Sequence, residues 1–190
     1  MNYLNYIKTY LDEVKHLCEL IDQESINSFI QSMESLKERN GRLFILGVGG
    51  SAANASHAVN DFRKILNIET YAVTDNSSEL TARINDDGWD TSYLNWLKVS
   101  KFGPNDAILI FSVGGGSDTV SLNLVRSMEY AKEINATILS VVSRNGGKAK
   151  ELSNSCILIP VVDDSRITPH AEEWQGIILH LVVNALTQKN

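Results

Sequence analysis

The sequence predicts an α/β protein: a three-layer α/β/α sandwich with a five-stranded parallel sheet, preceded by two N-terminal helices. Five short runs rich in Ile, Leu and Val alternate with stretches whose apolar residues recur at helical spacing. No tight hairpin turn joins consecutive runs, so the strands connect through helices. Strands connected in this way pair in parallel and are covered on both faces.

The 190 residues are 43% apolar and 21% charged, an ordinary composition for one globular domain. No Pro-rich or low-complexity linker divides the chain. We therefore expect a single domain over 1–190. It consists of N-terminal helices over 1–40 and an α/β core over 41–190 that ends in a helix.

The first 40 residues carry apolar side chains at helical spacing, with a break near Asp22 and Ser25. They predict two helices that end at Asn40-Gly41. The following sixty residues predict, in order, a strand over 43–46, a helix over 52–66, a short strand over 70–73, a helix over 78–84, a polar turn over 85–88 and a helix over 92–99.

The second half continues the alternation. It predicts a strand over 107–111, a helix over 118–135, a strand over 137–142, a short helix ending near 154, a strand over 156–161 and a loop over 163–168. A long terminal helix over 169–187 completes the layers, with Thr168 as its N-cap and Pro169 as its first residue.

The net charge of −6 argues against a nucleic-acid or anionic-membrane partner, because such surfaces need clustered Lys and Arg. No apolar run approaches the roughly 20 residues of a membrane span, and the N-terminus lacks the regions of a signal peptide. Cys18 and Cys156 have no metal-ligand spacing and are expected to be buried, reduced thiols. We expect a cytoplasmic protein.

Two stretches repeat one arrangement: an apolar run, a Gly/Ser turn and the start of a helical pattern. They read RLFILGVGGSAANASHAVN over 42–60 and DAILIFSVGGGSDTVSLN over 106–123. Such turns leave main-chain N–H groups and serine hydroxyls at a positive helix N-terminus, which suits an anion. Both turns are expected at the carboxyl ends of parallel strands, where they would hold a phosphorylated small molecule.

Gly47 to Ala52 also fits the G-x-G-x-x-A pattern of dinucleotide-binding proteins, and Asp75 ends the next strand. A nicotinamide or flavin oxidoreductase is therefore an alternative, as is a tight turn without a ligand. The serine in the turn, the second Gly/Ser turn and the two preceding helices favour a phosphate site. No Lys-Ser/Thr follows the glycines, which excludes a nucleotide P-loop.

Four side chains on two predicted helices are candidates for chemistry. His57 and Asp61 lie one helical turn apart, so they project from one helix face and could share a metal or a substrate proton. Glu172 and His180 raise the same question in the terminal helix. Each also has a plain structural interpretation, Glu172 as a complement to the helix dipole and His180 as a core residue.

The stretches GVGGSAANASHAVND, TDNSSELTARINDDGWD, SVGGGS and TPHAEEWQGIILHL together resemble the sugar isomerase (SIS) domain of phosphoheptose isomerases. The similarity spans about residues 40–185. The resemblance implies an SIS-type, flavodoxin-like sheet and a homotetramer with one Zn²⁺ in each subunit. It also implies the conversion of D-sedoheptulose 7-phosphate to D-glycero-D-manno-heptose 7-phosphate, in bacterial heptose synthesis for lipopolysaccharide or capsule.

The resemblance also implies roles for single residues. By position, the zinc ligands fall on His57, Asp61, Glu172 and His180. The substrate contacts fall on the three turns, at Gly49, Gly50, Ser51, Asn85, Asp86, Ser112, Gly114 and Ser117. His180 and one of Asp61 or Glu172 would exchange the proton that moves between adjacent carbons through an enediol. Glu172 and His180 are roughly 12 Å apart along a straight helix, so either the helix bends or one of them serves a neighbouring subunit.

Several positions depart from the family's usual residues. Val48 stands where the family has Asn, Asp61 replaces Glu, and Glu172 replaces Gln. Val113 and Gly114 remove two hydroxyls from the second turn, so backbone N–H groups must carry more of the phosphate binding. A related sugar phosphate stays open as the substrate. A non-catalytic SIS protein, a sugar-phosphate sensor or an initiator-associating protein, is the alternative from another class, and the retention of His57 and His180 argues against it.

Overall fold

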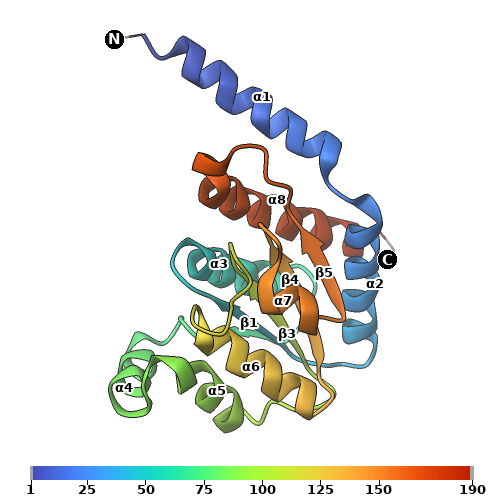
Figure 1. Ribbon diagram of the computed structural model, residues 1–190. Helices are drawn as coiled ribbons and strands as arrows, with labels where there is room; N and C mark the ends of the chain where they lie inside the picture. The colour runs from blue at the N-terminus through green and yellow to red at the C-terminus, as the bar shows by residue number, and fades with distance from the viewer. Residues whose placement is uncertain (1, 189–190) are drawn as a thin grey trace.

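The computed structural model describes residues 2–188, which form a parallel five-stranded sheet covered by helices on both faces (Figure 1). The strand order is β2-β1-β3-β4-β5, and every neighbouring pair is parallel. The strands are β1 (Leu43–Gly47), β2 (Thr70–Ala72), β3 (Ala107–Phe111), β4 (Thr137–Val142) and β5 (Ser155–Leu158). The predicted three-layer α/β/α architecture with two leading helices is confirmed.

Eight α-helices and one short 3-10 turn lie in the described range. They are α1 (Leu4–Leu20), α2 (Gln23–Glu38), α3 (Gly50–Lys64), α4 (Ser77–Asp87), α5 (Trp89–Val99), α6 (Leu122–Glu133), α7 (Gly147–Leu152), η1 (Asp164–Arg166) and α8 (Ile167–Thr187). Within residues 2–188, no helix has the length and apolarity needed to cross a membrane.

Alternation along the strands builds two separate cores. Phe44 and Ile108 point to the face covered by α5, α6 and α7. Their neighbours Leu43 and Leu109 point to the opposite face, where they pack against α2, α3 and α8. All five residues of β1 and of β3 are buried, as expected for central strands of a sheet with two covered faces.

Several predicted boundaries are wrong, among them the end of β5, which lies at Leu158 instead of 161. The turn expected over 85–88 is largely helical, because α4 continues through Asp87 and ends at Gly88. Helix α6 begins at Leu122, four residues later than predicted, since Ser117 holds a loop by accepting hydrogen bonds from the N–H groups of Thr119 and Val120. The N-cap of α8 is Arg166 instead of Thr168.

The apolar run over 177–183 in α8 is explained within one chain. Ile178, Leu179, Val182 and Val183 are buried against the sheet and its neighbouring helices. The apolar run over 177–183 suggests burial by a neighbouring subunit, but one chain covers most of it. Ile177 stays exposed on the other side of the helix.

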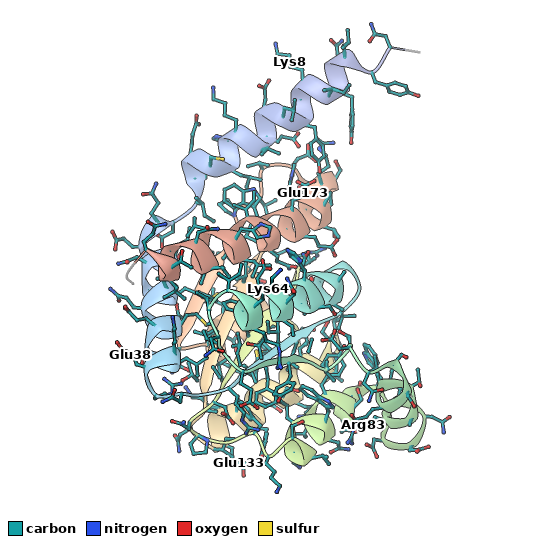
Figure 2. The ribbon with its side chains drawn as sticks, turned by 180° about the vertical axis from the view of Figure 1, so that it is seen from behind. Lys8, Glu38, Lys64, Arg83, Glu133 and Glu173 are labelled. Atoms are coloured by element: carbon teal, nitrogen blue, oxygen red, sulfur yellow. The ribbon has the colours of Figure 1, made fainter. Side chains whose placement is uncertain are left out.

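Helix α1 extends away from the body of the molecule (Figure 1) and is tied to the start of α8 by charged side chains. Glu13 accepts hydrogen bonds from the Arg166 guanidinium at 2.7 and 2.8 Å and faces Nε2 of His170 at 2.9 Å. Tyr10 donates to Glu173, which is labelled between the two helices in Figure 2. The Arg166 hydrogen bonds, with His170, lower the pKa of Glu13 to about 2.

The other side of α1 is open. Cys18 is exposed there, contrary to the expected burial, because α1 buries only Leu17 against the core. Cys156 is partly buried, and both thiols are free.

The contacts of Glu13 with Arg166 and His170, which join α1 to α8, predict a specific pH dependence of stability. The pKa of Glu13 is about 2, below its ordinary value of 4.5, so its contribution to stability is complete above pH 4.5 and is lost as the pH falls towards 2. The melting temperature of Glu13→Gln should lie below that of the wild type at pH 7, and the gap should close towards pH 2. Glu19→Gln, an exposed position on the same helix, should show no such gap. A gap that is equally large at pH 7 and pH 2.5 would contradict this assignment.

Candidate functional site

Helices α3 and α8 run side by side in the same direction and carry the candidate residues (Figure 2). Gln175 joins them, because its side-chain amide donates to Ser51 Oγ at 3.0 Å and its carbonyl accepts from Asn54 at 3.0 Å. Gln175 is fully buried and Ser51 is 2% exposed. Satisfied polar networks of this kind are costly to disturb, so they fix the relative position of the two helices.

Three side chains converge two turns further along this helix pair. Nε2 of His57 lies 3.0 Å from Nε2 of His180, and Oδ2 of Asp61 lies 3.7 Å and 3.6 Å from these nitrogens. Asn60 donates to the other Asp61 oxygen at 2.9 Å. The histidine side chains are about half exposed, whereas that of Asp61 is 11% exposed. The group is therefore anchored by a buried carboxylate and open to solvent.

The donor set of this group fits a zinc ion. Ligands about 2 Å from one tetrahedral Zn²⁺ lie about 3.3 Å from each other, close to the three separations here. Two imidazoles and one carboxylate also match the set of three protein ligands found in catalytic zinc sites, which leave one position open. His57, Asp61 and His180 would hold the ion.

Glu172 stands apart from this group. Helix α8 is continuous from Ile167 to Thr187, so Glu172 is roughly 12 Å before His180 along its axis. Its carboxylate lies against Gly50 at the start of α3, where a Cβ on Gly50 would be 2.3 Å from Glu172 Oε2. Within the described residues, no hydrogen bond or ion pair to this carboxylate is found. One chain thus does not bring Glu172 to the three predicted metal ligands.

A cavity of about 520 Å³ opens at the carboxyl ends of β1, β3 and β4. The second Gly/Ser turn forms much of its wall, with Ser112, Gly114 and Ser117, and Ser51 reaches it from α3. Thr168, in the first turn of α8, borders it from the opposite side. Both predicted phosphate turns therefore reach one cavity.

The second Gly/Ser turn offers hydrogen-bond donors to this cavity. The N–H groups of Gly114 and Gly116 have no acceptor in the described part of the chain. The hydroxyl oxygens of Ser112 and Ser117 accept main-chain hydrogen bonds from within the turn, which leaves each hydroxyl proton free to donate. Free N–H and O–H donors in a glycine-rich turn are typical of a phosphate site.

Packing between two loops requires glycine at Gly115 and at Gly147. A Cβ on Gly115 would lie 1.9 Å from the carbonyl oxygen of Gly146, and one on Gly147 would lie 2.3 Å from that of Gly116. Gly115 and Gly116 both have positive φ, at 73° and 79°. The absence of side chains at Gly115 and Gly147 lets the loops after β3 and β4 pack against each other, while Gly114 and Gly116 border the cavity.

The first turn is also held firmly. Gly49 has φ +64° and open space beside its Cα, and Gly50 begins α3. Tyr93 of α5 donates to the carbonyl oxygen of Gly47 at 2.9 Å. Burial raises the pKa of Tyr93 to about 12, which keeps this hydroxyl protonated as a donor.

Asn85 and Asp86 are not brought to this cavity by a single chain. They lie in the last turn of α4, exposed, with the Asn85 amide donating to Asp86 at 2.7 Å. Asp75, the acidic residue of the dinucleotide pattern, accepts a hydrogen bond from Ser56 on α3.

Sequence reasoning missed Asn54, Gln175 and Arg144. The sequence signal that could have found Gln175 is an amide side chain within the apolar part of the terminal helix, because a buried amide requires hydrogen-bond partners. Arg144 lies two residues after the end of β4 and borders the cavity, a position that no local sequence pattern indicates.

Fold and site together define a flavodoxin-like α/β protein with a cavity bordered by free N–H groups and a separate group of metal-ligand type. The SIS domain model matches residues 3–143, and the chain belongs to this family. It is 27% identical over 170 residues to the phosphoheptose isomerase of Helicobacter pylori, which is 86% of this chain and 83% of that protein. Phosphoheptose isomerases are thus among its homologues.

Two further comparisons mark the breadth of this family. The lincomycin biosynthesis protein LmbN of Streptomyces lincolnensis is 27% identical over 189 residues, 93% of this chain and 67% of that protein. The solved structure of a phosphoheptose isomerase from Neisseria gonorrhoeae superposes with a TM-score of 0.84 at 20% identity, covering 98% of this chain and all of that one. The structural match establishes a shared fold.

The contact between Gly50 and Glu172 predicts a contrast between two glycine variants. In Gly50→Ala, the new Cβ meets only the flexible end of Glu172, so the carboxylate should turn away while the melting temperature stays within about 2 °C of the wild type. In Gly47→Ala, the Cβ would lie 2.4 Å from the main-chain oxygen of Ser51, and the melting temperature should fall clearly. Equal losses in thermal melts of both variants would refute this reading of the turn.

Proposed function

We propose that this protein is a metal-dependent sugar-phosphate isomerase that interconverts D-sedoheptulose 7-phosphate and D-glycero-D-manno-heptose 7-phosphate. One observation carries the proposal: His57, Asp61 and His180 converge on the same helix pair whose start borders the anion-binding cavity. Similarity to phosphoheptose isomerases supports the choice of substrate. Such an enzyme would act in the cytoplasm, in heptose synthesis for lipopolysaccharide or capsule.

The phosphate would bind in the cavity, to the turn that carries Ser112, Gly114 and Ser117. Gly49, Gly50 and Ser51 would contact the sugar from the first turn, and Asn85 and Asp86 stay proposed contacts outside this cavity. Ser51 lies six residues before His57, roughly 9 Å along α3. That separation is comparable with the length of an extended seven-carbon sugar phosphate, whose reacting end would then approach the histidines.

The reaction moves a proton between C1 and C2 through an enediol, and it needs a base that becomes an acid. We assign this exchange to His180 together with one carboxylate. In a single chain this carboxylate is Asp61, because Glu172 lies against Gly50, roughly 12 Å from His180 along the axis of α8. Asp61 is held by Asn60 and by its position between the histidines, which suits it to hold the metal. A bound Zn²⁺ would supply Lewis-acid polarisation of the carbonyl and hydroxyl oxygens.

The decisive experiment measures zinc content and isomerisation of D-sedoheptulose 7-phosphate on the same preparations. The wild type should contain zinc and form the aldose phosphate. His180→Ala should lose zinc and at least about a hundredfold in kcat, as expected when a proton-transfer residue is removed. Its melting temperature should change little, because this side chain is more than half exposed.

His16→Ala is the matched control, because His16 is an exposed histidine far from the group, paired only with Glu19. It should keep the zinc content and rate of the wild type. A wild type that binds sugar phosphates but isomerises none of them would contradict the proposal and favour a sensor. A thermal shift with NAD(H), and none with sugar phosphate, would favour an oxidoreductase.

The projecting helix supports a further proposal, that the chain forms a homo-oligomer, as a tetramer. Helix α1 exposes a row of large apolar side chains, namely Tyr3, Leu4, Tyr6, Ile7 and Leu11. Apolar surface of this extent on an extended helix is typical of a protein interface. A second copy of the same chain would bury it in a closed, symmetric assembly.

Changing two of these side chains tests the oligomer. Ile7→Glu/Leu11→Glu places two charges in the apolar row and should reduce the mass measured by light scattering to that of a monomer. Lys8→Glu/Lys15→Glu changes the charge of the same helix at exposed polar positions and should leave the mass unchanged. A wild-type protein that stays monomeric at micromolar concentration would refute this arrangement.

A further inference from the structure

We propose that Arg144 is the residue that recognises the phosphate charge: its guanidinium binds the phosphate dianion in the cavity and selects phosphorylated over unphosphorylated sugars. The inference deepens the proposed function and rests on it for the identity of the sugar. Nothing in the Gly/Ser turns themselves assigns this role, because Arg144 lies in the loop that follows β4.

The position of Arg144 directs its side chain to the phosphate turn. The loop after β4 turns back at once, with the N–H of Gly146 donating to the carbonyl oxygen of Ser143 at 3.0 Å. Asn145 holds the same loop by accepting from the N–H of Gly147. A Cβ on Gly114 would lie 3.8 Å from Cδ of Arg144, so the arginine stem lies beside the turn whose N–H groups are free.

Arg144 is the residue at the cavity whose charge is available to a phosphate. Among the described residues that border the cavity, it is the one charged side chain. It makes no ion pair in the described part of the chain, whereas the nearby Lys148 pairs with Glu151 at 3.1 Å and Asp118 at 3.8 Å. In a protein of net charge −6, a phosphate dianion needs a local cation of this kind.

The backbone gives independent support. Six non-glycine residues in the described range have positive φ. Four of them follow the ends of helices, where this conformation is common: Asn40, Asn67, Lys101 and Asn135. The other two, Ser121 and Arg144, both border the cavity, at 55° and 56°. Arginine is disfavoured in this conformation, and such residues gather at functional sites.

The composition of the second turn explains why an arginine would be needed. Val113 and Gly114 stand where the family has hydroxyl side chains, so two donors to the phosphate are missing. A guanidinium offers five donors in a planar fork and binds phosphate through two of them at once. Gly114 leaves room for that fork, because it has no side chain between Arg144 and the cavity.

The experiment is isothermal titration of the wild type and of Arg144→Asn with inorganic phosphate, glucose 6-phosphate and glucose at pH 7.5 and low salt. Asparagine accepts positive φ better than most residues, so this variant removes the charge without straining the loop. The dissociation constants for phosphate and glucose 6-phosphate should rise at least about tenfold, as for loss of a charge-assisted hydrogen bond. Glucose should bind weakly to both proteins.

Two further variants sharpen the result. Arg144→Lys should recover part of the affinity, since it restores the charge but not the fork. Arg126→Gln removes an exposed arginine of α6 that pairs with Glu129, and it should bind phosphate like the wild type. If Arg144→Asn melts far below the wild type, Arg144→Gly takes its place, because glycine also adopts positive φ freely.

The outcomes separate this inference from the proposed function. Unchanged phosphate affinity in the Arg144 variants, or no phosphate binding by the wild type, overturns the role of Arg144. If phosphate binds through Arg144 but D-sedoheptulose 7-phosphate is not isomerised, the proposed function fails and the inference stands. If the wild type isomerises it and Arg144→Asn has the same KM, the inference fails and the proposed function stands.

Discussion

The buried amide of Gln175 holds the parallel pair of α3 and α8 together, and the geometry of the site depends on that pair. Gln175 is fully buried, and it bonds Ser51 on one side and Asn54 on the other. Asn54 also donates to the main-chain oxygen of Glu172 at 2.9 Å. Removing any one partner leaves a buried polar group without a hydrogen bond, which costs about 1–3 kcal/mol. Because these bonds fix both the register and the separation of the helices, they also fix the distance between His57 and His180.

The proposed anion binding and the proposed chemistry thus lie at two ends of one pair of helices. At the cavity end, the loops after β3 and β4 pack so closely that only glycine fits at Gly115 and Gly147. This packing fixes the turn that carries the free N–H groups, and Arg144 lies beside that turn. At the other end, a carboxylate on α3 and two histidines on different helices meet at the surface. Each end is formed by residues from two parts of the chain. Each therefore depends on how loops or helices pack against each other as much as on the chemistry of the side chains.

The sequence predicts the layers well and the site only in part. Strands rich in Ile, Leu and Val connected by helices leave little choice of architecture, and β1 and β3 lie within one residue of their expected bounds. His57 and Asp61 could be paired from spacing alone, because they share one helix. His57 and His180 are 123 positions apart, so only the packing of α3 on α8 brings them together. The roles of Gly115 and Arg144 depend on contacts between two loops, which no local pattern contains.

The polar network also limits what Glu172 can do. Asn54 donates to the main-chain oxygen of Glu172 and to Gln175, which holds this part of α8 against the start of α3. The Glu172 carboxylate therefore lies beside Gly50 and away from the metal-ligand group of its own chain. It stays at the N-terminus of α3, where the helix dipole favours a negative charge. A carboxylate kept there, about two helical turns from the histidines, could reach a substrate atom lying between the two ends but could not complete the metal site. The replacement of the family's Gln by Glu at this position would then add a proton acceptor beside the sugar chain, and the metal would rely on His57, Asp61 and His180.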